Sequence, residues 1–580
     1  MADTDLRPGV RSRSAPSRVF VALWSTGIFL GGLQAWTSRY AMNPDGILYL
    51  DNADAYFRGD FAHAVNTLWS PLYPWILGLA THTLHPTALQ EFPLVHAVNF
   101  LIFLLALGAF QFFLQEFLAA ARTLWKMDPR GEVLIAAVSS VAFLYAMLDF
   151  CGPALATPDL LVAAFAYLAA AWLLRLQRGA GGPLASLALG LTLGAGYLAK
   201  APFFLYGLLC IAICWAFSRA SGPAASRGPV SRTVLALAAF AAVAAPYIAV
   251  LSHAKGRVTF GDSAKYNLIW HVNGLPPTHW QGGPGANGAP VHPTHRISLD
   301  PPVYEFAGPV GGTYPPWYDA AYWNDGARVA FRISDFIRAA IREFRLYEYL
   351  VHRRQIAFVA GFLILFFLLP SRRAYARRLI ELWPLLLFGL FPFLIYLPVH
   401  AESRYLAPFF VLIWTALYAP LTAESSSQQL AASRVTSTVT AVMCALMFVE
   451  ACLVAMPANP IQSAREAATA APPRPRLQQE IAQALETLGA APGDGVAIVS
   501  NVPEYTWARL ARVRVVAEVV LAADCGVSSP QGAEQWERAR AALEETSARF
   551  AVSGCLEGVT SRPGWTDLAG SGLFALRLRP

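Results

Sequence analysis

The chain has 580 residues, of which 56% are hydrophobic and 14% are charged, and its formal net charge is +7. Soluble domains carry about 45–50% apolar and about 25% charged residues, so this composition excludes an ordinary soluble protein. The positive charge does not indicate nucleic-acid binding, because the excess arginines lie in short loops between apolar runs, where they set orientation in a membrane.

The apolar runs predict a helical protein that crosses the membrane many times. A spanning helix needs about 20 mainly apolar residues, and this criterion predicts about eleven spans. They lie near 19–37, 92–118, 132–149, 159–175, 184–199, 203–218, 232–252, 355–370, 381–398, 405–422 and 435–456. Residues 71–85 are shorter and contain two prolines, so we expect them to lie at the interface or to re-enter the membrane.

Lys and Arg lie mostly in alternate loops, which orients the chain. The positive-inside rule then places residues 1–18 in the cytoplasm, and the first apolar run lacks the small-residue cleavage pattern of a signal peptide. The loops 38–91 and 253–352 and the part after 456 are expected on the outer side. We therefore predict a multi-pass protein of a bacterial-type plasma (inner) membrane, with a transmembrane part at 19–456.

The long outer segments differ in character. The loop 253–352 is rich in Gly, Pro, His and Trp and is expected to be irregular, with an arginine-rich amphipathic helix near 328–350 on the membrane surface. Residues 457–475 form a Pro/Ala linker, and 476–580 alternate helical and strand patterns, which predicts a small α/β domain outside the cytoplasm. Cys525 and Cys555 lie in this domain, and whether they pair stays open.

The first outer loop carries several carboxylates. Asp45 follows the first span and precedes a helical pattern at 46–58. It suits either a helix cap or a base at the membrane surface. Asp51 and Asp54 share one face of this pattern with Arg58, and we expect a solvated, paired face there.

Three further charges lie at the outer ends of spans. Asp159 begins a span after Thr157 and Pro158, Lys200 separates two spans, and Arg404 separates two others. Each has an ordinary alternative: a helix-start signal for Asp159, a side chain reaching the interface for Lys200, and a local pair with Glu402 for Arg404. Four interfacial charges from four separate connections nevertheless indicate one shared site.

These residues lie in motifs that resemble the GT-C superfamily of membrane glycosyltransferases. The resemblance is to the branch of protein O-mannosyltransferases and the lipid A aminoarabinose transferase, and it covers about residues 19–420. The matching stretches are Asp45 with Tyr49 and Gly59-Asp60, Pro71 to Trp75, Thr157 to Asp159, Gly196 to Pro202, and Arg404 to Pro408. Two positions depart from the pattern: Gly46 replaces a second acid, whose role is lost or taken by Asp51, and Ser70 replaces a lysine.

The resemblance implies sugar transfer from a polyprenyl-phosphate sugar to an acceptor hydroxyl on the outer face, with inversion. Asp45 is then the expected general base and Asp159 the second candidate catalytic residue. The expected substrate- and phosphate-binding residues are Tyr49, Lys200, His400, Glu402, Arg404 and Tyr405. The partners are the lipid-linked donor, a protein, lipid or glycan acceptor, and membrane lipids, with no nucleic acid.

We expect no metal or other cofactor, although a divalent cation between Asp45 and Asp159 stays an alternative, because the oligosaccharyl-transferring branch needs one. Two other functions stay open. Intramembrane charges also mark transport paths, so the chain is alternatively a flippase of a lipid-linked sugar. The third alternative is a catalytically inactive scaffold.

Overall fold

The structure is a computed structural model of the whole chain. It describes residues 15–125, 127–220, 228–282, 287–291, 295–306, 312–315, 319, 322–422, 430–456, 476–499, 502, 505–521, 530–554 and 564–579. The expected linker 457–475, Cys525 and Cys555 lie outside these residues.

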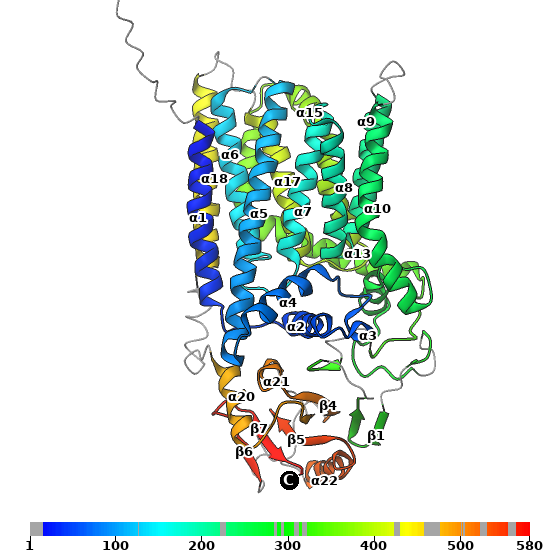
Figure 1. Ribbon diagram of the computed structural model, residues 1–580. Coiled ribbons are helices and arrows are strands. Elements are labelled where there is room, and N and C mark those ends of the chain that lie inside the picture. Colours follow the sequence, from blue (N-terminus) through cyan, green and yellow to red (C-terminus); the bar gives the residue numbers. More distant parts are fainter. Residues whose placement is uncertain are drawn as a thin grey trace, which may run out of the picture.

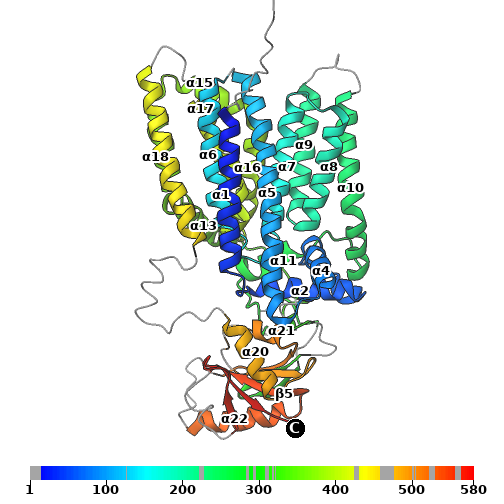
Figure 2. The same ribbon diagram turned by 60° about the vertical axis from the view of Figure 1, so that its left-hand side comes forward.

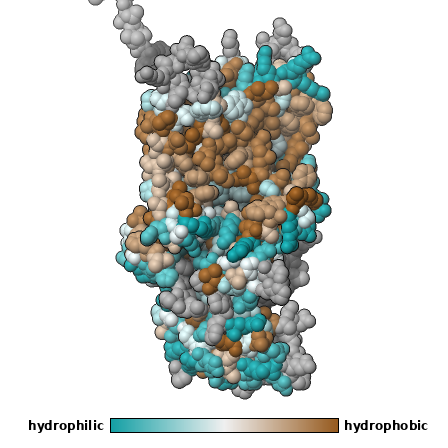
Figure 3. Space-filling model, turned by 90° about the vertical axis from the view of Figure 1, so that its right-hand side faces the viewer, coloured by the Kyte–Doolittle hydropathy of each residue, from teal (hydrophilic) through white to brown (hydrophobic). Residues whose placement is uncertain are grey.

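Long apolar helices form a bundle (Figure 1). The long ones are α1 (Ala15–Thr37), α5 (Ala88–Trp125), α6 (Pro129–Asp149), α7 (Asp159–Gln177), α8 (Gly182–Ala199), α9 (Phe203–Ala220), α10 (Gly228–Lys255), α17 (Ser403–Thr422) and α18 (Leu430–Ala455). Two shorter apolar helices, α14 (Ile356–Phe367) and α16 (Trp383–Tyr396), belong to the same bundle, and the short, arginine-rich helix α15 (Arg372–Glu381) lies between them in the chain. On the face shown in Figure 3, apolar side chains cover the middle of the bundle as a broad band, with polar residues at both ends. This surface suits a hydrocarbon layer.

Within the described residues, eight helices are long and apolar enough to span a membrane. The number rises to 10 if two bent pairs each count as one span; the pairs are Ile333–Arg353 with α14, bent by 73°, and α15 with α16, bent by 79°. A shorter apolar helix, Phe203–Phe217, corresponds to the remaining expected span. The multi-pass helical fold is thus confirmed.

Short helices lie across one end of the bundle (Figures 1 and 2). They are α2 (Pro44–Phe57), α3 (Phe61–Ala64), α4 (Leu72–Leu84), α11 (Ser263–Asn267) and the π-helix η1 (Leu268–Val272). Pro44 occupies the first turn of α2 and Asn43 precedes it in extended conformation, as is usual at a helix start. Helix α4 coincides with the segment that the sequence predicts to lie at the interface.

The amphipathic helix of the second loop is α13 (Ile333–Glu348), which continues as η2 (Tyr349–Arg353). Its outer apolar side chains are exposed, among them Ile337 at 53% and Phe344 at 64%. Its inner face buries Asp335, Ala339 and Glu343. An exposed apolar stripe at the end of the bundle agrees with a helix lying on the membrane surface.

The C-terminal part contains more sheet than its sequence predicts. The helices α20 (Leu477–Thr487), α21 (Thr506–Leu510) and α22 (Pro530–Leu543) and the strands β3 (Gly495–Val499), β4 (Arg514–Val519) and β5 (Ala548–Ser553) follow the expected alternation. The strands β6 (Trp565–Asp567) and β7 (Phe574–Arg577) add a hairpin that the pattern does not predict.

Two more strands come from the loop that we expected to be irregular. They are β1 (His295–Leu299) and β2 (Pro302–Glu305), and they complete a seven-stranded sheet in the order β1-β2-β4-β3-β5-β7-β6. Strand β2 runs antiparallel to β4, with Tyr304 opposite Glu518. The second outer loop and the C-terminal part therefore share one sheet, a long-range pairing that local periodicity does not reveal.

Candidate active site

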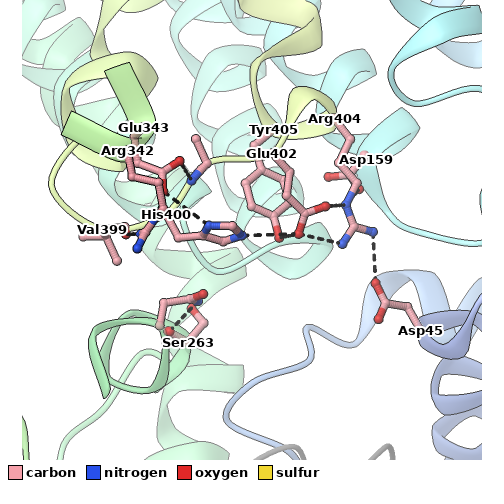
Figure 4. Close-up of polar contacts among 12 residues, drawn as sticks. Asp45, Asp159, Ser263, Arg342, Glu343, Val399, His400, Glu402, Arg404 and Tyr405 are labelled. Atoms are coloured by element: carbon pink, nitrogen blue, oxygen red, sulfur yellow. Dashed lines mark hydrogen bonds and ion pairs between the residues drawn. The ribbon is translucent and has the colours of Figure 1, made fainter. Parts of the chain in front are cut away.

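A cavity of about 290 Å³ lies where the short helices meet the end of the bundle (Figure 4). Seven of the eight residues expected from the sequence line it: Asp45, Tyr49, Lys200, His400, Glu402, Arg404 and Tyr405. The eighth, Asp159, lies directly behind them. The other lining residues are Leu68, Trp69, Ser70, Pro158, Ala199, Ala201, Pro202, Ser263, Asn267, Trp270, His271 and Tyr396.

Asp45 lies in the first turn of α2, where the helix dipole favours a negative charge. Its Oδ2 accepts a hydrogen bond of 2.9 Å from Nη1 of Arg404. Its side chain is 31% exposed, so the carboxylate faces the cavity while it stays paired. Figure 4 shows the two side chains pointing toward each other from opposite walls.

Asp159 is a buried carboxylate that contacts two cations of the site. It begins α7, its side chain is only 1% exposed, and its Oδ1 accepts a hydrogen bond of 2.5 Å from Nζ of Lys200. Nε of Arg404 lies 3.7 Å from its other oxygen. One buried carboxylate thus holds two cations at the wall of the cavity, which offsets part of the cost of their burial.

Arg404 is the residue that joins the two carboxylates. It lies in the first turn of α17; besides its hydrogen bond to Asp45 and its ion pair with Asp159, it donates to both oxygens of Glu402, at 2.7 and 3.2 Å. The local pair with Glu402 expected as an alternative is therefore present together with the long-range contacts. Tyr405 donates its hydroxyl to Glu402 at 2.9 Å, and Lys200 Nζ lies 4.0 Å from the centroid of its ring.

His400 adds a further cation. Burial disfavours its charged form, but the carboxylates of Glu343 and Glu402, 3.6 and 3.8 Å away, outweigh this effect and raise the pKa of His400 to about 9. The imidazole is therefore protonated at neutral pH. The side chain of Glu402 is 38% exposed; its partial burial disfavours the charged form, but the neighbouring His400 and the hydrogen bonds from Arg404 outweigh this effect and hold the pKa of Glu402 well below the usual range.

His271 is a cavity residue that the sequence argument missed. Its ring stacks on His400 with the centroids 3.8 Å apart. Burial, together with the neighbouring charges of His400 and Arg342, lowers the pKa of His271 to about 4, so it is neutral. Trp69, Asn267 and Trp270 were missed as well. Asn267 and Trp270 lie in α11 and η1, within a loop that the sequence predicts to be irregular, and the only signal there was the abundance of Trp and His.

At the two positions that depart from the GT-C pattern, Gly46 and Ser70, the structure shows different surroundings. A Cβ at Gly46 would lie 2.2 Å from Sδ of Met42 and 2.7 Å from Cβ of Ala156, so no side chain fits there in this conformation. Asp51, the alternative position for the second acid, does not line the cavity and accepts a hydrogen bond from Arg509 instead. Ser70, which stands where the pattern has a lysine, lines the cavity.

The expectation that Asp51 and Asp54 form a solvated face paired with Arg58 is wrong. Asp51 is only 2% exposed, and both carboxylates accept hydrogen bonds from Arg509 in the C-terminal part. The spacing on α2 placed them correctly on one face, but that face packs against a segment more than four hundred residues later in the chain.

The charges of the cavity bear on the alternative of a divalent cation between Asp45 and Asp159. Among the described residues, no group of three or more His, Cys, Asp and Glu is placed to hold a metal ion. Asp45 is paired with Arg404, and Asp159 with Lys200, so a divalent cation would meet two positive side chains.

No protein-family model and no curated protein matches the chain. Among solved structures, it is similar to ArnT from Cupriavidus metallidurans bound to undecaprenyl phosphate, with 12% identity, a TM-score of 0.51 and coverage of 98% of this chain and 99% of that one. It also aligns with the oligosaccharyltransferase of Archaeoglobus fulgidus in a complex with Zn and sulfate, with 13% identity, a TM-score of 0.44 and coverage of 92% and 67%. The likeness to ArnT concerns the fold alone: the chain has an ArnT-like fold, as the resemblance in the sequence led us to expect.

Proposed function

We propose that the protein is an integral-membrane glycosyltransferase that moves a sugar from a polyprenyl-phosphate-linked donor to an acceptor hydroxyl. The observation that carries the proposal is the cavity at one end of the bundle, in which the carboxylate of Asp45 shares the lining with Lys200, Arg404 and His400. A phosphate needs cations and an acceptor hydroxyl needs a base, and both are within one small space. The fold shared with ArnT, which was crystallised with undecaprenyl phosphate, supports this donor class.

In the proposed reaction, Asp45 removes the proton of the acceptor hydroxyl. The oxygen attacks the anomeric carbon, the bond from this carbon to the phosphate oxygen breaks, and its electron pair leaves with the lipid phosphate. The new bond forms on the opposite face, so the configuration inverts. A positioned base of this kind supplies about 10²–10⁴-fold in rate.

The cations stabilise the departing phosphate. Arg404 presents a planar fork to phosphate oxygens, and Lys200 and His400 add point charges. Asp159 orients Lys200 and Arg404 from behind the wall, as its contacts of 2.5 and 3.7 Å with them suggest. Tyr49, Glu402 and Tyr405 complete the wall against which the substrate lies.

The positive-inside orientation puts this end of the bundle on the outer side of a bacterial-type plasma membrane, with the N-terminus in the cytoplasm and the C-terminal part outside. The donor would then reach the cavity from the outer leaflet. The acceptor is a hydroxyl of a protein, a lipid or a glycan.

The test is sugar transfer by the purified full-length protein from a panel of polyprenyl-phosphate sugars, analysed by mass spectrometry. We expect transfer by the wild type, a loss of about 10²–10⁴-fold in Asp45→Asn, and no change in Asp300→Asn, an exposed carboxylate outside the cavity. A chelator is added in a parallel series and should not change the rate.

Other outcomes separate the competing functions. Movement of the lipid-linked sugar across a vesicle membrane without formation of a glycosidic bond would identify a flippase. Equal transfer by wild type and Asp45→Asn would remove Asp45 from the mechanism, and the absence of both transfer and movement would favour a scaffold.

A further inference from the structure

Arg509 of the C-terminal part lies at the centre of a buried ion network. Its Nη1 donates to Asp51 at 2.8 Å and to Asp54 at 2.7 Å, and its Nη2 and Nε donate to Glu91 at 2.8 and 3.2 Å. The side chains of Arg509, Asp51 and Glu91 are 6%, 2% and 2% exposed. Arg512 adds a contact of 3.1 Å to Glu91.

This network joins three parts of the chain. Asp51 and Asp54 lie on α2, Glu91 lies in the first turn of α5, and Arg509 lies on the short helix α21. The second outer loop takes part too, because Thr313 donates its backbone N–H and its hydroxyl to Asp51 at 2.7 and 3.0 Å. Figure 1 shows α21 directly beside α2, between the sheet and the bundle.

Arg509 compensates the negative charges of the network. Three carboxylates meet there, and Arg509 is the only cation that contacts all three in the described residues. Loss of one partner from a buried ion pair leaves an uncompensated charge that is far more costly than the pair itself. Without the guanidinium, Asp51 and Asp54 would repel each other and Glu91, and α2 would separate from α21.

Helix α2 also carries the proposed base. Asp45 and Asp51 lie on the same helix of 14 residues, separated by about 9 Å along its axis at 1.5 Å per residue. The helix is held at its first turn by the contact of Asp45 with Arg404 and further along by Arg509. A short helix moves as a rigid unit, so a shift at Asp51 is passed on to Asp45 and Tyr49.

We infer that Arg509 is a positioning residue for Asp45, so that the C-terminal part belongs to the working site and not to a separate module. The inference rests on the proposed glycosyltransferase function for its catalytic consequence. The structural part of the inference, that Arg509 holds α2 in place, depends only on the contacts described above. A displacement of about 1 Å in a reacting group costs about a hundredfold in rate, which is the scale expected here.

The experiment compares Arg509→Met and Arg509→Lys with the control Arg538→Met in the full-length protein. Arg538 also joins the C-terminal part to the second outer loop, through Asp300 at 2.9 Å, but the contact is exposed. Two quantities are measured: hydrogen exchange of the α2 amides, and kcat and KM for the lipid-linked donor. If Arg509→Met does not fold, Arg509→Lys and Asp54→Asn, which keep most of the network, carry the test.

We expect at least tenfold faster exchange in α2, a fall in kcat of ten- to a hundredfold and a donor KM within twofold of wild type for Arg509→Met. Arg509→Lys should be intermediate, because one ammonium cannot serve three carboxylates, and Arg538→Met should match the wild type. Unchanged α2 exchange with unchanged kcat, or a kcat that falls only in step with thermal stability, would overturn the inference. If the wild type transfers no sugar, the proposed function fails. Faster α2 exchange in Arg509→Met would still support the structural part of the inference, that Arg509 holds α2 in place.

Discussion

Arg404 and Asp45 lie 359 residues apart in the chain, and Nη1 of the one donates to Oδ2 of the other at 2.9 Å. This contact ties the first turn of α17 to the first turn of α2 across the cavity. It brings the candidate base and the strongest candidate phosphate ligand into direct contact before substrate arrives. A phosphate that enters must therefore compete with Asp45 for Arg404, and this exchange would free the carboxylate for its acceptor.

Arg404→Lys should lower kcat/KM for sugar transfer. The lysine keeps the charge, but it cannot contact Asp45, Asp159 and Glu402 at once as the planar guanidinium does. Loss of one charge-assisted hydrogen bond of about 1.5–3 kcal/mol corresponds to a decrease of about ten- to a hundredfold. Arg39→Lys, at a partly exposed arginine outside the cavity, is the control. Equal activity of both variants would show that the fork geometry is not used.

Asp159 and Lys200 should be energetically coupled. Their contact of 2.5 Å has a fully buried acceptor, and removal of Lys200 takes away the nearer of the two cations of Asp159, since Arg404 lies 3.7 Å away. A double-mutant cycle of Asp159→Asn and Lys200→Met in the free energy of unfolding should give a coupling of about 0.5–3 kcal/mol. The control cycle pairs Asp159→Asn with Arg175→Met, at the opposite end of α7, and should be additive. Additivity in both cycles would contradict the pairing.

His400→Gln should change the stability in a pH-dependent way. The folded pKa of His400 is raised to about 9 from 6.5, because the carboxylates of Glu343 and Glu402 outweigh the effect of burial. A raised pKa means that the protonated ring stabilises the fold fully below pH 6.5 and that this contribution is lost as the pH rises through about 9. The difference in thermal midpoint between wild type and His400→Gln is therefore expected to be largest at low pH and to vanish at high pH. A difference that does not change with pH would contradict the charge of His400.

Gly46→Ala should destabilise the protein. The new Cβ would lie 2.7 Å from Cβ of Ala156, a short side chain that cannot turn aside, and overpacking of this kind costs about 1–3 kcal/mol. The second substitution Ala156→Gly should restore part of the loss. Gly32→Ala, where the nearest atom is 3.6 Å away, is the control on another helix, and thermal unfolding in detergent measures all three. A neutral Gly46→Ala would mean that α2 has room for the acid found in the GT-C pattern.

The sequence alone determined the membrane part, because each hydrophobic span is a run of consecutive apolar residues. All the expected spans correspond to helices of the structure. Asp45, Lys200 and Arg404 were predicted to share one site because they lie at the ends of spans at one membrane surface, and in the structure they line one cavity. The amphipathic helix α13 was also predicted from the sequence, because its periodicity lies within one continuous segment.

Only the tertiary structure decided which charges pair with which. Asp51 and Asp54 appeared to be a solvated face beside Arg58, but their partner Arg509 is 458 and 455 residues away, and no local pattern encodes such a distance. Likewise, β2 joins β4 from a loop that looked irregular, and His271 reaches His400 by stacking. Local periodicity fixes which face of an element is polar, whereas the partner of that face depends on how distant segments pack, and this is decided by the folded chain as a whole.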